Sequence, residues 1–498
     1  MILEVIIEHM KNFQQFKDFC KKSYFLLFLI LAIFFLKGLV LLTVIPIFNG
    51  YDEARHYNTI QYLAEPKEKN WPTVEKGKTN EGDLVQRFNY SEEIKKTAEK
   101  IRRVGGEDKC NLYETNLFDQ GFYGRNEKEI NSRSWKQYND EYPVNIASSG
   151  KSLYHKLGAI IEKLLSEKSI LTRFYTLRIF SVLFGTTTIL IFYLILKNIG
   201  FSKKHSLLLT AIISFQPHFS FYYTYINYDC LLILFFSTFV LGAILSLKNG
   251  INWKNLTLMI ASIFFGIWIK GTAYILLAVF VFLISFLIYK KLSKKTNARA
   301  VYWLYFFLTV SFFIIAITLG KYLPLIGNFN EIAGSFFRYF MKNADFGLIL
   351  LSSKTYWGTL PFGNWISNNL ISIIWLIQFI SIIGLFIFIF SKKKPEFLPE
   401  KKYTIFFILM ILALQAGIRL ADWQYFAQDG KLELQTPGRY FFPNIALHIT
   451  LVFIGLGMIS KILKKENYFD FILSSGLVLM FILFMHNLFN LLLLDFYL

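Results

Sequence analysis

Ionisable and polar side chains stand at four places beside long apolar stretches of this chain of 498 residues. They are Asp52 with Glu53, Asn227 with Asp229, Lys270, and Arg439. An ionisable group at membrane depth is costly, so each place is a candidate for function. A carboxylate can take a proton from a hydroxyl group as a general base. Arg and Lys can hold a phosphate and stabilise its charge as it departs.

The composition sets the class of protein in which this chemistry would occur. Apolar residues make up 54% of the chain and charged residues only 17%, whereas an ordinary soluble domain has about 25% charged residues. Long apolar runs predict membrane spans and argue against a soluble enzyme or a disordered chain. The net charge of +19 is typical of basic cytoplasmic loops in a membrane protein, so no nucleic-acid partner is expected. Three distant cysteines predict neither a disulfide framework nor a cysteine metal site.

Eleven apolar stretches are long enough to read as transmembrane helices. They cover residues 24–48, about 175–196, 206–226, 229–247, 255–269, 271–289, 300–323, 368–390, 403–420, 439–460 and 468–495. The stretch from Leu256 to Tyr289 is divided at Lys270, because one span needs only roughly 20 residues. The sequence therefore predicts an all-α polytopic membrane protein with about 11 spans.

Lysine and arginine residues gather in every second loop and orient the spans. Basic clusters follow the second, fourth, sixth, eighth and tenth spans, and the N-terminal tail is also basic. Since cytoplasmic loops carry the excess of Lys and Arg, the N-terminus is predicted to be cytoplasmic and the C-terminus extracytoplasmic.

This orientation divides the chain into six parts. They are a cytoplasmic tail (1–23), the first transmembrane helix (24–48), a large extracytoplasmic loop (49–172), transmembrane helices two to seven (175–323), a second extracytoplasmic loop (324–366), and transmembrane helices eight to eleven (368–498).

The first outer loop is predicted to be mainly helical. Helices are expected over Ala54–Glu65, which Pro66 stops, and over Glu92–Val104, which Ser91 caps. A third helix, Ser152–Leu165, carries an apolar stripe that suits the membrane interface. The region from about 65 to 150 matches no known motif.

All four polar places fall at the outer membrane interface under this topology. The simplest reaction that uses them is transfer of a sugar from a polyprenyl-phosphate donor to an acceptor hydroxyl. Asp52 would be the base, Arg439 and Lys270 would bind the lipid phosphate, and the sugar would lie against aromatic residues such as Trp357.

An ordered set of motifs over about residues 50 to 445 strengthens this hypothesis. The set comprises Asp-Glu-x-x-His (Asp52, Glu53, His56), Leu-Arg-x-x-Ser (Leu177, Arg178, Ser181), Pro217 to Asp229, the apolar-Lys turn at Lys270, Tyr356 to Trp365, and Gly438-Arg439-Tyr440 with Pro443. It resembles a family of multispanning prokaryotic membrane proteins. The acidic motif after the first span also resembles the GT-C superfamily of lipid-dependent glycosyltransferases, which includes the protein O-mannosyltransferases.

The resemblance implies an inverting glycosyltransferase with a GT-C-like fold. It implies that Asp52 or Glu53 is catalytic, with Asp52 favoured. It further implies substrate contacts from His56, Arg178, Asn227, Asp229, Lys270, Trp357, Arg439 and Tyr440. The expected partners are a polyprenyl-phosphate-linked sugar, the lipid bilayer, and an acceptor that is an extracytoplasmic glycan, lipid or protein, at the plasma membrane.

Other interpretations of the same residues stay open at this stage. The two acids can simply cap a helix, where negative charge favours the N-terminus. No cofactor is firmly implied, although His56 with Asp52 and Asp229 could hold a divalent cation. Alternative functions are a transporter or flippase of lipid-linked sugars, a polysaccharide ligase or polymerase, and a non-catalytic scaffold for envelope assembly.

Overall fold

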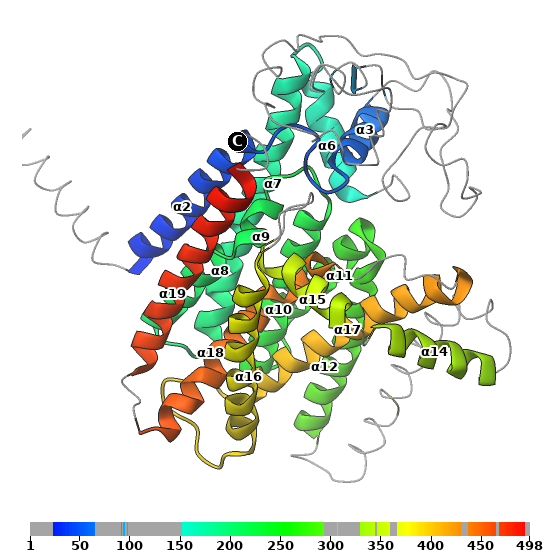
Figure 1. Cartoon of the computed structure of the whole chain (residues 1–498). Coiled ribbons are helices and arrows are strands. Elements are labelled where there is room, and N and C mark those ends of the chain that lie inside the picture. Colours follow the sequence, from blue (N-terminus) through cyan, green and yellow to red (C-terminus); the bar gives the residue numbers. More distant parts are fainter. Residues whose placement is uncertain are drawn as a thin grey trace, which may run out of the picture.

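The computed structural model describes residues 23–64, 91, 93–94, 97, 152–292, 306, 329–343, 346–358, 366–429, 437–464 and 468–493, and within these ranges there is no strand (Figure 1). The helices are α2 (Ser23–Val44), α3 (Glu53–Ala64), α6 (Leu153–Leu164), α7 (Ile170–Asn198), α8 (Lys203–Ser214), α9 (Pro217–Tyr222), α10 (Asp229–Asn249), α11 (Trp253–Ile269), η3 (Gly271–Ala273), α12 (Tyr274–Leu292), α14 (Phe329–Asn343), α15 (Phe346–Trp357), α16 (Asn368–Phe390), α17 (Lys401–Asp429), η4 (Gly438–Asn444), α18 (Ile445–Ile462), α19 (Tyr468–Asn487) and η5 (Leu488–Leu493).

Eight helices in the described part of the chain are long and apolar enough to cross a membrane. They begin at Tyr24, Ile170, Asp229, Gly271, Asn368, Lys401, Gly438 and Tyr468. The all-α, membrane-spanning class is therefore confirmed. The predicted span at 255–269 is α11, an apolar helix of 17 residues. The tail 1–23 and the predicted span 300–323 lie almost wholly outside the described residues, and the total of eleven spans stays a prediction.

The predicted single span at 206–226 is broken into α8 and α9. Pro217 begins α9, where a missing backbone N–H does no harm, and the Gln216 side chain accepts a hydrogen bond from Phe219 N at 2.5 Å. Lys37 of α2 reaches this break, donating to the carbonyl of Ser214 and to Ser220 Oγ, the latter at 2.8 Å. The break is thus supported by polar groups inside the bundle, the condition under which a helix can be interrupted at membrane depth.

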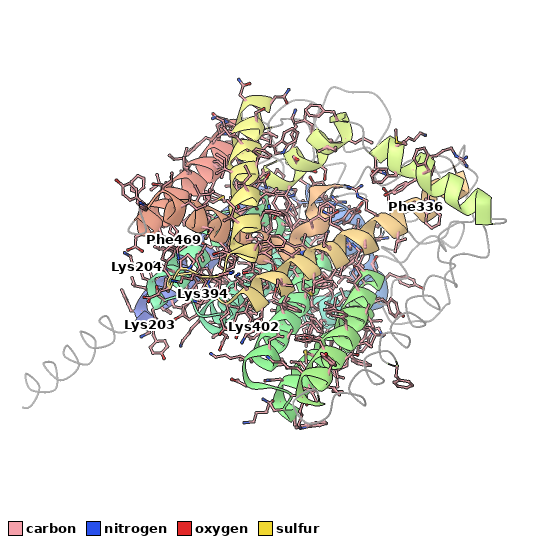
Figure 2. The ribbon with its side chains drawn as sticks, turned by 90° about the horizontal axis from the view of Figure 1, so that it is seen from below. Lys203, Lys204, Phe336, Lys394, Lys402 and Phe469 are labelled. Carbon is pink, nitrogen blue, oxygen red and sulfur yellow. The ribbon has the colours of Figure 1, made fainter. Side chains whose placement is uncertain are left out.

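The two ends of the bundle differ in chemical character. Lys203, Lys204, Lys394 and Lys402 lie on the face seen from below in Figure 2. The helices α3 and α6 lie at the opposite end, at the top of Figure 1. This separation agrees with the predicted alternation of basic loops on one side and an outer helical layer on the other.

The helices α3 and α6, which form the outer layer, are joined to the bundle by buried charges. Arg173 of α7 forms ion pairs with Glu162 of α6 and with Glu93. Tyr57 of α3 donates to Glu162 at 2.9 Å, and Gln61 donates to Glu93 at 2.9 Å. The layer is therefore fixed to the top of α7, which contributes directly to the candidate site.

The predicted helices of the outer loop agree with those observed. The stretch predicted at Ala54–Glu65 is α3, and the one predicted at Ser152–Leu165 is α6. Ser91 accepts a hydrogen bond from Ile94 N at 3.2 Å, as expected of an N-cap, and the rest of the Glu92–Val104 prediction lies mainly outside the described residues. In α6 the exposed apolar residues include Ile160 and Leu164, whereas the charged Glu162 is buried.

Close packing of α16 on α18 sets the position of the segment that carries Arg439. A Cβ atom at Gly384 would lie 2.1 Å from the Gly455 carbonyl oxygen, and one at Gly455 would lie 2.1 Å from the Ser381 carbonyl oxygen. Only glycine allows this approach of two backbones, as in other tightly packed membrane helices. Ser381 Oγ adds a hydrogen bond to the Val452 carbonyl at 2.8 Å.

We expect Gly384→Ala to lower the free energy of unfolding by about 1–3 kcal/mol, because the added methyl group forces the two helices apart. Denaturant or thermal unfolding of the purified protein in detergent measures this. Gly334→Ala is the matched control, since its Cβ would meet nothing closer than Arg338 Nη1 at 3.5 Å. Equal stability of Gly384→Ala and the wild type would contradict the packing argument.

Candidate functional site

Glu53 and Arg178 form a buried pair in which both groups are saturated with hydrogen bonds. The Glu53 carboxylate accepts from Arg178 Nε and Nη2 at 2.9 and 2.7 Å, from Gly50 N at 2.9 Å and from Ile226 N at 3.0 Å. Arg178 also donates to the carbonyl oxygens of Leu42, Ile45 and Pro46, which close the end of α2. All five N–H groups of the guanidinium are thus in use.

This arrangement gives Glu53 and Arg178 a positioning role. The pair joins the end of α2, the start of α3, α7, and the segment before α10. Neither group has a hydrogen-bonding position left for a ligand, so the predicted direct contacts of Arg178 with phosphate and of Glu53 with an acceptor receive no support from this geometry.

Asp52 points the other way because of the turn that precedes α3. Phe48 and Asp52 have φ angles of +63° and +55°, a left-handed conformation that Asp tolerates better than most residues. Gly50 packs against Tyr225 so closely that a Cβ atom would lie 2.6 Å from its ring. The turn therefore buries the Glu53 side chain and leaves that of Asp52 54% exposed.

Arg439 lies next to this exposed carboxylate. Its Nη2 is 3.7 Å from Asp52 Oδ2, and its guanidinium carbon is 3.9 Å from the centre of the Tyr51 ring. In the part of the chain that the structure describes, this is the one ion pair that Arg439 makes, and it is long compared with a charge-assisted hydrogen bond of about 2.7–2.9 Å. The guanidinium is held by an aromatic face and by a loose ionic contact, so an incoming anion can compete for it.

The start of η4 explains why Arg439 follows a glycine. A Cβ atom at Gly438 would lie 2.4 Å from the Ser352 carbonyl oxygen and from Tyr356 N. The Gly438 amide donates to Thr355 Oγ1 at 2.7 Å. The Gly438 amide is therefore taken by α15 and is not available to a phosphate.

Lys270 and Asp229 form a second, tighter ion pair. Lys270 Nζ lies 2.9 and 3.1 Å from the two carboxylate oxygens of Asp229, and Tyr222 donates to the same carboxylate at 2.9 Å. Asn227 Oδ1 accepts from Asp229 N at 2.8 Å, which orders the turn before α10. Asp229 is the first residue of α10 and at the same time fixes Lys270.

Tyr440 joins the two ion pairs into one site. Its ring centre is 4.9 Å from Lys270 Nζ and 5.4 Å from the guanidinium carbon of Arg439. A small cavity of about 20 Å³ lies between these residues and also touches Asp229, Thr272 and Leu414. Thr272 Oγ1 is buried there and has no hydrogen-bond partner among the described residues. Two cations, an aromatic ring and an unpaired hydroxyl therefore converge on one point.

His56 is paired with a histidine that sequence reasoning missed. His56 Nδ1 lies 2.9 Å from His155 Nε2, the two rings stack at 5.2 Å, and Tyr228 meets both rings edge-on. Burial lowers the pKa of both histidines well below the usual value, and the positive charges of Arg55, Lys270 and Arg439 lower that of His56 further. Both imidazoles are therefore neutral at pH 7.

The hydrogen bond between the histidines favours one tautomer. His155 Nδ1 is buried without a partner among the described residues. An unpaired buried N–H costs more than an unpaired lone pair, so the favoured proton lies on His155 Nε2 and is donated to His56 Nδ1. His56 then carries its own proton on Nε2, as a neutral hydrogen-bond donor near the two cations of the site.

Trp357 does not contact Arg439 or Lys270 in the described structure but packs against neighbouring aromatic residues. It is 7% exposed and contacts Tyr356 and His448. Tyr356 is linked through Phe442 and His218 to Tyr51, with ring distances of 5.5, 5.1 and 5.6 Å. The predicted contact of Trp357 with a sugar stays a prediction, and the aromatic rings that the structure places beside Arg439 are those of Tyr51 and Tyr440.

The residues do not fit the possible divalent cation site. His56 is turned to His155, and Asp229 is occupied by Lys270. Among the residues that the structure describes, no group of three His, Cys, Asp or Glu side chains is placed to hold a metal ion.

Comparisons with known proteins identify the family. Residues 34–448 match a family of predicted membrane proteins (DUF2142), and the chain belongs to it. No curated protein matches the chain. No solved structure matches it either.

Two adjacent acids allow a matched test of the buried pair. We expect Glu53→Gln to lower the free energy of unfolding by about 3–5 kcal/mol, because it leaves the Arg178 charge buried without its counter-ion. Asp52→Asn, one residue away and half-exposed, should change stability by less than about 1 kcal/mol. Unfolding in detergent followed by tryptophan fluorescence measures both. Similar losses of stability in the two variants would contradict a buried structural role for Glu53 beside an exposed Asp52.

The histidine pair predicts a loss of stability in acid. A histidine whose folded pKa is lowered binds a proton more readily when unfolded, so stability is full above the unfolded pKa of about 6.5 and falls as the pH drops below it. We expect the unfolding temperature to fall between pH 7.5 and 5.5, and His155→Phe to weaken this dependence. Tyr154→Phe is the control, since burial raises the pKa of that phenol still further above this range. A pH profile unchanged in His155→Phe would count against the neutral pair.

Proposed function

We propose that this DUF2142 membrane protein is a glycosyltransferase that moves a sugar from a polyprenyl-phosphate donor to a hydroxyl acceptor on the extracytoplasmic side of the plasma membrane. The observation that carries the proposal is the exposed carboxylate of Asp52, 3.7 Å from a guanidinium that an aromatic ring holds in place. A base and a phosphate-binding cation side by side are what such a transfer needs.

The reaction can be written with named residues. Asp52 takes the proton of the acceptor hydroxyl while the acceptor oxygen forms a bond to the anomeric carbon. The bond from that carbon to the phosphate oxygen breaks, and the lipid phosphate departs with the electron pair. Arg439 stabilises the departing phosphate, with Lys270 near the same Tyr440 ring. A single displacement of this kind inverts the anomeric centre.

The remaining polar residues position these groups. Glu53 and Arg178 hold the turn that exposes Asp52, and Asp229 with Asn227 holds Lys270. His56, which burial keeps neutral, supplies a hydrogen-bond donor near the sugar. Thr272 Oγ1, which lies unpaired in the same small cavity, supplies another.

The arrangement also weighs against a transporter of lipid-linked sugars. Transporter sites lie near the bilayer midplane, between structural repeats. Here Asp52, Lys270 and Arg439 all stand at the ends of apolar helices, beside the outer helical layer. A scaffold would not need an exposed base next to a loosely held cation.

Release of free polyprenyl phosphate tests the proposal directly. The purified protein in nanodiscs is mixed with a panel of polyprenyl-phosphate sugars and acceptors. We expect Asp52→Asn to lower turnover by about 10²–10⁴-fold while donor binding persists, the range for loss of a general base. Arg439→Ala should weaken donor binding and turnover together.

Asp470→Asn is the matched control for charge. Asp470 is an acid paired with Lys204 at the end of the bundle opposite α3 and α6, and its loss should leave turnover unchanged. Donor binding without release in every variant, with acceptors present, would reject the transferase and favour a transporter or scaffold. Release of long glycan chains only would point instead to a ligase or polymerase.

A further inference from the structure

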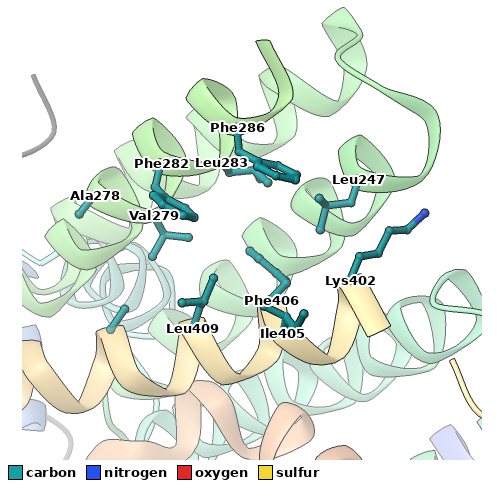
Figure 3. Close-up of a pocket in the computed structure, with 11 residues that line it drawn as sticks. Leu247, Ala278, Val279, Phe282, Leu283, Phe286, Lys402, Ile405, Phe406 and Leu409 are labelled. Atoms are coloured by element: carbon teal, nitrogen blue, oxygen red, sulfur yellow. The ribbon is translucent and has the colours of Figure 1, made fainter. Parts of the chain in front are cut away.

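An apolar groove of about 460 Å³ runs between α12 and α17 (Figure 3). It extends from Lys402 and Phe286 at one end to Ala278 and Ala413 at the other. Apolar side chains line it along this length, with Lys402 as the one charged residue.

The groove has a buried floor and an open side. Leu283 and Phe406 form the floor and are 3% and 6% exposed. Phe282 and Ile405 form the rim and are each 45% exposed. Because both helices are long and apolar enough to cross a membrane, the open side faces lipid hydrocarbon, and a chain can enter it from the bilayer.

One end of the groove adjoins the cation site. Ala413 lines the groove, and the next residue, Leu414, lines the small cavity between Lys270 and Arg439. Lys270 immediately precedes the segment that begins the groove wall on the other side, η3 and α12. From Ala413 the groove follows α17 back to Lys402, a helical length of about 17 Å.

At the other end, Lys402 is the one charged residue that lines the groove, and it is already paired. Its Nζ lies 2.9 Å from Glu400 and also faces the ring of Tyr403. Among the cations that line the groove or the small cavity, Arg439 has the longest ion pair, so an anionic headgroup competes most easily for the Lys270–Arg439 end.

We infer that this groove holds the prenyl chain of a lipid phosphate whose phosphate binds between Lys270 and Arg439. The inference rests on the proposed function. It adds where the donor's lipid chain binds and what kind of chain it is. Close contact along the floor of the groove provides the binding energy, since many small dispersion contacts sum to a large one. The groove thus selects a phosphate with a long single chain.

The test compares two phosphates that differ only in the tail. The full chain in nanodiscs is titrated with a long polyprenyl phosphate and with a short one of two isoprene units. We expect the long form to bind at least about tenfold more tightly. Ala413→Trp, which fills the groove, should abolish that preference and leave binding of the short form unchanged.

Leu412→Trp is the matched control. Leu412 is the neighbouring residue of α17 and is 58% exposed, and it does not line the groove, so the preference for the long tail should remain. Phosphatidic acid is titrated as well, because its two acyl chains offer the same headgroup with a different tail.

The possible results distinguish a failure of the groove from a failure of the phosphate site. Equal binding of long and short forms, still dependent on Arg439, would overturn the groove and leave the phosphate site standing. Binding of phosphatidic acid as tight as that of the long polyprenyl phosphate, and lost in Ala413→Trp, would make the groove a phospholipid site and also overturn the inference. If no phosphate binds in an Arg439-dependent way, the proposed function itself fails.

Discussion

The rest of the site depends on the buried contact between Glu53 and Arg178. A buried ion pair is weak evidence for stability, because removing two charges from water costs about as much as their attraction returns. Its value here is geometric. Arg178 joins the carbonyl oxygens that end α2 to the carboxylate that begins α3, and Glu53 also takes the Ile226 amide. Three parts of the chain that are far apart in the sequence, around residues 42–53, 178 and 226, are thereby fixed at one point.

That constraint separates charges that build the site from charges that are available for chemistry. Glu53 and Asp52 are neighbours in the sequence, but their side chains differ in role. The Glu53 carboxylate accepts hydrogen bonds from buried donors, whereas Asp52 lies 3.7 Å from Arg439. The same division recurs among the groups around Tyr440. Asp229 binds Lys270 at 2.9 Å and holds it in place, whereas Arg439 rests mainly on an aromatic face.

Sequence reasoning found much of the site because span ends are easy to place. Asp52, Lys270 and Arg439 each stand at the end of an apolar stretch, and the alternation of basic loops puts those ends on one face. It missed groups whose role depends on three-dimensional contacts. His155 lies on the side of α6 away from most of its apolar stripe. The spacing of the apolar residues therefore did not mark His155 as part of the site. The break at Gln216-Pro217 and its support by Lys37 were hidden within a stretch that hydropathy reads as continuous.

The loose pair of Asp52 and Arg439 places the proposed base and the proposed phosphate-binding group in direct contact. Arginine can form two parallel hydrogen bonds with a phosphate, and these are stronger than its 3.7 Å contact with one carboxylate oxygen of Asp52. In the proposed enzyme, the donor phosphate therefore competes with Asp52 for the guanidinium. When the phosphate binds, the Asp52 carboxylate is released beside the sugar, where it can meet the acceptor hydroxyl.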